Sequence, residues 1–242
     1  MDKKVQEALG AALAGYKIGQ SGSLPANFEL NGSVKGFYEA LVKIFSSEEN
    51  FKSKMKAMDD AFDENPEFAP LQEFFFDLLL INFFQSDATR LGEDYLESPE
   101  WVKIEDETID RGTELLNLFL YLHECETENI EPELSDYLKE FLLIEEEEFQ
   151  EELEIYEEVV ANQMLVESTY GEIAKTANKL DETAPLKDLF YVLMSFFNET
   201  YPDAADLKEY LKQAENKPFD TAALFAILVY NNNLSELPVK IN

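Results

Sequence analysis

The chain has 242 residues, 45% of them hydrophobic and 19 of them phenylalanine, so it can bury a sizeable core as one large domain or two small ones. Its 51 acidic residues outnumber 19 basic residues, and the net charge is −32. This charge disfavours direct binding to nucleic acid and to anionic membrane surfaces, because both need a basic stripe on the protein.

The compartment and the fold class follow from the residue types that are scarce. A single cysteine, Cys125, permits no internal disulfide bond, and the N-terminal residues are too polar for a secretory signal. We therefore expect a cytoplasmic protein. Nine glycines and nine prolines are fewer than average, which is typical of a chain with many helices and few tight turns.

Residues 1–32 are predicted to form an N-terminal helix and a flexible arm. The helix is expected from Asp2 to about Gly15, with Val5 and Leu9 on an alanine-rich face. From Gly15 to Gly32 the chain holds glycine, serine, proline and asparagine in quick succession, a pattern typical of a loop.

The next two elements are predicted to be amphipathic helices. The first runs from Ser33 to about Phe45 with apolar residues at helical spacing. Ser46 and Glu49 fit a capping box at the start of the second, which we expect to end near Phe62.

The longest apolar run is APLQEFFFDLLLINFF, from Ala69 to Phe84. Proline suits the first position of a helix, so we expect a helix to begin at Pro70. Because it is apolar nearly all round, this helix should be buried on several faces. It contains four polar residues and is shorter than the roughly 20 apolar residues that a bilayer crossing needs, so it is not predicted to span a membrane.

A second run, APLKDLFYVLMSFF from Ala184 to Phe197, resembles the first at a fixed offset (184 − 69 = 115). The same offset aligns Tyr95 with Tyr210, and Pro185 with Pro70 as a second helix start. We interpret this as an internal duplication. The prediction is an all-α, compact multihelical domain of about nine to eleven helices, built from helical repeat unit 1 (33–130) and helical repeat unit 2 (131–242) packed together.

An acidic stretch from Glu145 to Glu158 has nine glutamates in fourteen residues. Phe149, Leu153 and Tyr156 keep an apolar stripe, which predicts an amphipathic helix with one anionic face. Such a face either keeps a phenylalanine-rich protein soluble or docks a basic partner. The residues of this acidic face are Glu147, Glu148, Glu151, Glu154 and Glu158.

Other chemistry is weakly supported. Trp101 lies in a segment expected to be a linker, with its side chain in the core. His123 is the only histidine, so metal sites that need two or three histidines do not occur. Paired carboxylates are so abundant that none can be selected as a general acid and base. We assign no catalytic residue, metal site or cofactor.

Three functional hypotheses remain. The first is a non-enzymatic binding protein whose acidic face docks or sequesters a basic protein partner, as an inhibitor or immunity-type protein does. The second is a helical scaffold whose acidity only confers solubility. The third is a small-ligand-binding protein with a pocket between the repeat units, lined by Phe75, Tyr95, Phe190 and Tyr210.

Overall fold

The computed structural model describes residues 1–88, 98–108, 111, 114–142, 155–232 and 239–240. Helices dominate these residues, and the predicted all-α class is confirmed. The α-helices are α1 (Lys3–Ser21), α2 (Gly32–Ser46), α3 (Phe51–Glu64), α4 (Gln72–Asn82), α6 (Pro99–Thr108), α7 (Glu114–Glu128), α8 (Leu134–Leu142), α10 (Tyr170–Ala177), α11 (Lys187–Asn198), α12 (Ala204–Gln213) and α13 (Lys217–Tyr230). Shorter helical turns are η1 (Pro66–Leu71), η2 (Phe83–Ala88) and η4 (Gln163–Glu167), and 155–161 is also helical.

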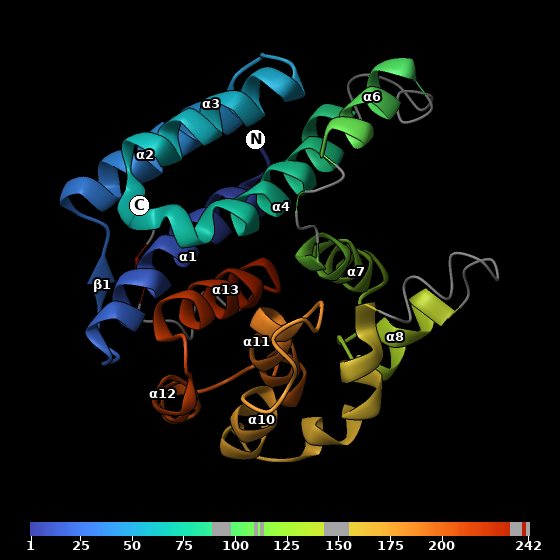
Figure 1. Cartoon of the computed structure of the whole chain (residues 1–242). Helices are drawn as coiled ribbons and strands as arrows, with labels where there is room; N and C mark the ends of the chain where they lie inside the picture. Colours follow the sequence, from blue (N-terminus) through green and yellow to red (C-terminus); the bar gives the residue numbers. More distant parts are fainter. Residues whose placement is uncertain (89–97, 109–110, 112–113, 143–154, 233–238, 241–242) are drawn as a thin grey trace.

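Helices α1 and α13 form the centre of the molecule. Figure 1 shows them side by side between the α2–α3 layer and the group formed by α10, α11 and α12. The Asp2 side chain accepts a hydrogen bond from the Val5 backbone N–H at 3.0 Å and so caps the start of α1. Gly22 follows the last residue of α1 in the left-handed conformation (φ 67°) and caps its end. Both helices are buried along nearly their whole length, so the two ends of the chain share one core.

The flexible arm expected from Gly15 is wrong in its first part, because α1 continues to Ser21. Gly15 and Gly19 lie where α1 touches the backbone of α13. A Cβ atom on Gly15 would lie 2.5 Å from the Thr221 carbonyl oxygen, and one on Gly19 would overlap the Lys217 carbonyl. These glycines therefore permit a close helix contact and do not create a loop.

The α2–α3 layer covers α1 and α4. Phe37 of α2 stacks on Phe68 with ring centroids 4.8 Å apart and meets Phe62 of α3 edge to face at 5.1 Å. The predicted capping box at Ser46 is wrong: α3 begins later, and the Asn50 side chain accepts from the Ser53 N–H at 2.9 Å. Asparagine is one of the strongest N-cap residues, which explains the later start.

Helix α4 is buried from Phe74 to Asn82, as its all-round apolar pattern predicts. The expected starts at the two prolines are wrong by two residues, because Pro70 lies in η1 and α11 begins at Lys187, beyond Pro185. The first residues of α4 and α11 keep the offset seen in the sequence (187 − 72 = 115). The duplication itself stays a prediction.

Two peripheral segments complete the described fold. Trp101 is 5% exposed, which confirms its place in the core, but it lies in α6 and not in a linker. Near the C-terminus, β2 (Val239–Lys240) pairs in parallel with β1 (Phe28–Glu29), so this part of the tail is anchored to the segment after α1.

Candidate functional site

A pocket of about 300 Å³ lies between the two predicted repeat units, where η1, α4 and α7 face α11 and α13. Figure 1 shows these helices meeting around the middle of the molecule. Four of its lining residues are acidic and the other six are apolar. The described residues that line it are Pro70, Glu73, Phe74, Asp77, Glu114, Leu115, Pro185, Asp188, Leu189 and Phe219.

Asp77 is the buried acid of this pocket. Its side chain is 3% exposed, and its Oδ2 atom accepts a hydrogen bond from the Leu115 backbone N–H at 3.2 Å. Leu115 lies in the first turn of α7, where unpaired N–H groups and the helix dipole favour a carboxylate. The Oδ1 atom has no hydrogen-bond partner in the described part of the chain. One oxygen of a buried carboxyl group is thus unsatisfied beside a cavity.

The position of Asp77 disfavours its ionised form while the pocket is empty. Burial raises the pKa of the Asp77 carboxyl well above its ordinary value, and the Glu114 carboxylate raises it further. The hydrogen bond from Leu115 and the positive charge of Arg111 lower the pKa, but they do not reverse the effect. A cation in the pocket would favour the carboxylate again.

An ion pair holds the rim of the pocket on the α4 side. The Nε atom of Arg111 donates to the Glu73 carboxylate at 2.7 Å, and the guanidinium lies 4.3 Å from the ring centroid of Phe76. Arg111 also reaches Asp59 of α3 at 3.4 Å. Because Arg111 is itself mostly buried, it fixes Glu73 in position without entering the lining of the pocket.

The pocket brings together positions that the predicted duplication aligns. Glu73 and Asp188 are 115 residues apart (188 − 73 = 115), and so are Pro70 and Pro185. Each acid lies in the first turn of its helix, α4 or α11. The two predicted units thus contribute equivalent acids to one cavity.

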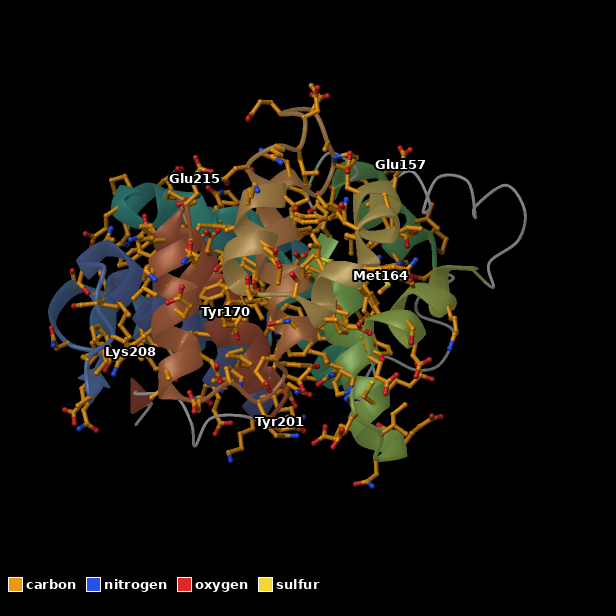
Figure 2. All side chains as sticks on the ribbon, turned by 90° about the horizontal axis from the view of Figure 1, so that it is seen from below. Glu157, Met164, Tyr170, Tyr201, Lys208 and Glu215 are labelled. Carbon is orange, nitrogen blue, oxygen red and sulfur yellow. The ribbon has the colours of Figure 1, made fainter. Side chains whose placement is uncertain are left out.

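A second pocket of about 240 Å³ adjoins the first through Asp188. It contains the buried Asp220, and Glu215 stands beside it at the surface (Figure 2). This pocket already holds a cation, because Lys187 also lines it and lies 3.7 Å from Glu182. The Lys187 ammonium also donates to the carbonyl oxygens of Ala177 and Leu180. We therefore assign the candidate site to the first pocket.

The acidic face that the sequence predicts falls largely outside the described residues. Glu147, Glu148, Glu151 and Glu154 all lie there. Glu158 is described, in the helical stretch 155–161, and is half-buried. Its neighbour Glu157 is exposed, and Figure 2 shows it at the edge of the molecule.

The described aromatic residues predicted to line an inter-unit pocket are packed in the core. Phe75 and Phe190 are fully buried, and Phe75 packs against Phe62 at 5.5 Å between ring centroids. Tyr210 stacks on Tyr191 at 4.7 Å, and its hydroxyl donates to the Asp220 carbonyl at 2.9 Å. Tyr95 lies outside the described residues. None of the three described residues is part of the lining of the pocket between the units.

One feature of the sequence does indicate that Asp77 is buried. Asp77 interrupts the run FFFDLLLIN, and a carboxyl group inside a helix that is apolar on all sides must be buried. Its two neighbours in the site, Glu114 and Asp188, carry no comparable signal. Their helices also bear other acids, so only the folded chain selects them.

Comparison with known proteins adds no further assignment: a scan against protein-family models and searches of curated proteins and solved structures gave no significant match. Among the described helices, none combines the length and the hydropathy that a membrane crossing requires. Within the same residues, no three histidine, cysteine, aspartate or glutamate side chains are grouped closely enough to hold a metal ion.

Proposed function

We propose that this chain is a non-enzymatic binding protein that docks a basic protein partner, and that a cationic side chain of the partner enters the pocket between the repeat units. The observation that carries the proposal is the unpaired Oδ1 atom of Asp77 beside a cavity with four acidic lining residues. No basic residue belongs to the described lining. A positive charge from outside is the missing counterpart.

The energetics favour such a partner. A buried acceptor without a hydrogen bond costs about 1–3 kcal/mol, and a charge-assisted hydrogen bond from a cation would remove that penalty. Interaction between opposite charges is also stronger in a partly dry pocket than in water. The net charge of −32 attracts basic proteins over longer distances and speeds their association. The predicted acidic face would add to this attraction.

A binding role agrees with the chemistry of the lining. The described residues of the pocket include no histidine, cysteine, serine or threonine that could act as a nucleophile. The apolar residues, among them Phe74, Leu189 and Phe219, offer packing surface to an aliphatic stem. The pocket thus provides charge at its base and contact area at its walls.

The test compares two variants that each replace two aspartates by asparagine. Asp77→Asn/Asp188→Asn replaces two acids of the pocket, whereas Asp63→Asn/Asp106→Asn replaces two exposed acids on α3 and α6. Fluorescent poly-L-lysine and poly-L-arginine of matched length serve as basic polypeptide probes at about 150 mM salt. We expect the pocket variant to lose about ten-fold or more in affinity for at least one probe, and the surface variant to lose about two-fold.

Equal losses in the two variants would contradict the proposal. In that case the probes bind to the charge of the whole molecule, and the acidity serves solubility, as the scaffold hypothesis states. Circular dichroism and urea unfolding of both variants show that each is folded before binding is measured.

A further inference from the structure

We propose that the pocket between the repeat units is a receptor for the ammonium group of a lysine side chain, and that it discriminates against arginine. This inference rests on the proposed function and names the chemical group that the basic partner presents. It follows from the acceptor geometry at Asp77, the walls of the pocket and the acids at its rim.

The first argument is the number of free acceptors on Asp77. The Oδ2 atom of Asp77 already accepts a hydrogen bond from the Leu115 N–H, and its Oδ1 atom has no partner in the described part of the chain. A guanidinium binds a carboxylate best through two parallel N–H groups that reach both oxygens. An ammonium is a compact charge that needs only one oxygen of each carboxylate. A single buried oxygen therefore fits lysine better than arginine.

The second argument is the apolar wall. Six of the ten described lining residues are proline, phenylalanine or leucine, and they come from both repeat units. Four methylene groups precede the ammonium of lysine, and such stems pack along apolar surface while the charge reaches a polar group. The volume of about 300 Å³ is at the small end for ligand sites, which suits one side chain and not a larger ligand.

The third argument is the placement of the other acids. An ammonium has three donors, and Asp77 Oδ1 can satisfy only one of them. Glu114 of α7 and Asp188 of α11 line the same pocket and provide acceptors from two other sides. Glu73 shares its carboxylate with Arg111 and adds negative charge at the rim. Glu73, Glu114 and Asp188 thus place negative charge around the pocket from α4, α7 and α11.

Binding should also release a proton. The charged groups that face Asp77 are Glu73 on its own helix, Glu114 at the start of α7, Asp188 on α11 and Arg111, whose guanidinium is the only cation among them. Burial and the carboxylates of Glu114 and Glu73 raise the pKa of Asp77 and so favour its protonated form, whereas an ammonium favours the carboxylate. Affinity for the ammonium should therefore increase with pH as Asp77 loses its proton.

The experiment uses probes with one positive charge, so that the charge of the whole molecule contributes equally to each. We would titrate the full-length protein with n-butylammonium and with n-butylguanidinium, and follow the ¹³C signal of the Asp77 carboxyl group, identified by its loss in Asp77→Asn. We expect about ten-fold tighter binding of butylammonium in the wild-type protein. Calorimetry in two buffers of different ionisation enthalpy measures the released proton.

Three variants control the result. Asp77→Asn should abolish the preference for butylammonium. Asp188→Asn changes an exposed rim acid, so the fold is preserved, and it should weaken butylammonium binding by about three-fold. Asp63→Asn lies far from the lining on α3 and should leave binding unchanged.

Equal affinity for the two probes, or a preference that survives Asp77→Asn, would overturn the inference about lysine. The proposed function would still stand if poly-L-arginine bound with the expected dependence on the pocket acids. Both proposals fail together if neither the polypeptides nor the small cations respond to Asp77 and Asp188. The polypeptide probes therefore test the proposed function, and the small cations test the preference for lysine.

Discussion

Asp220 is a second buried carboxyl group, and its titration affects the stability of the fold. It lies in the first turn of α13 and is 4% exposed. Burial raises the pKa of Asp220 to about 7; a backbone hydrogen bond from Asn216 lowers it, and the carboxylates of Asp188 and Glu215 raise it. In the unfolded chain the same group titrates near 3.8. Between these values the folded protein binds one proton more than the unfolded chain.

The sign of the pH dependence follows from this difference. The free energy of unfolding decreases as pH rises from about 4 to about 7, and the loss persists at higher pH because the carboxylate is then buried in the folded state. Asp220→Asn removes the titration. We expect it to raise the free energy of unfolding relative to wild type by on the order of 4 kcal/mol at about pH 8, and to leave it unchanged at about pH 3.5.

Urea unfolding of the two proteins at both pH values measures this change. Asp63→Asn is the matched control, because its side chain is exposed and its replacement should have a small effect at either pH. A stabilisation by Asp220→Asn of the same size at pH 3.5 and pH 8 would show that packing, and not titration, is responsible.

At the level of residues, the sequence shows that certain acids are buried but not what they face. Asp77 lies inside an apolar helical run, and such a pattern predicts burial of the carboxyl group, whereas Asp220 precedes its apolar run in the first turn of α13. The N–H group that binds Asp77 belongs to Leu115, 38 residues away, and Asp188 lies in the other repeat unit. Contacts of this range depend on how the helices pack, which no local spacing encodes.

At the level of elements, the α1–α13 contact predicts opposite effects for two glycine substitutions. Gly19→Ala would place a Cβ atom on the Lys217 carbonyl, where backbone opposes backbone and neither can move cheaply. We expect it to lower the free energy of unfolding by at least about 2 kcal/mol. Gly36 lies in α2, where no atom lies within 4 Å of the methyl group that alanine would add. We expect Gly36→Ala to raise the free energy of unfolding by about 0.5–1 kcal/mol.

Urea unfolding at one pH is sufficient for this pair, because both substitutions add the same methyl group to a helix. If Gly19→Ala were neutral or stabilising, α1 and α13 could not be packed as closely as described. The effects of Gly19→Ala and Gly36→Ala would then reflect helix propensity alone.

The same glycines explain which elements could be predicted from the sequence. Helices with a regular apolar stripe, such as α2, were identified by spacing, and α4 was identified by its continuous apolar run. The second half of α1 was interpreted as a loop because Gly15 and Gly19 are typical of loops and of tight helix contacts alike. Only the presence of α13 against α1 distinguishes these two roles.

At the scale of the whole molecule, the pocket connects the predicted duplication with the proposed function. In the predicted alignment of the two units, Glu73 and Asp188 occupy equivalent positions, and each lies on its own helix at the rim of one cavity. Asp77 has no acidic equivalent, because the corresponding residue is Val192 (192 − 77 = 115). Two similar units can thus form an asymmetric site, with one buried acid between two rim acids, and that asymmetry suits a ligand with one charged end.

The net charge of −32 predicts that added salt stabilises the fold and weakens ligand binding. Mutual repulsion of the acids disfavours the compact state, and salt screens it, since the Debye length decreases from about 10 Å at 0.1 M to about 3 Å at 1 M. We expect the melting temperature to rise by several degrees between about 0.05 and 0.5 M NaCl at pH 7, where each kcal/mol corresponds to about 2–4 °C for a chain of this size. Binding of butylammonium should weaken over the same range.

The control for this prediction is the same titration near pH 4, close to the isoelectric point of about 4.1, where the net charge is small. There the rise in melting temperature with salt should largely disappear. A similar rise at both pH values would show that the salt strengthens apolar burial and does not screen repulsion. If instead the melting temperature rises only at pH 7 while butylammonium affinity does not decrease, the pocket is shielded from the ions that screen the surface. The charge of the molecule would then set its stability, and the local acids at Asp77 would set its affinity.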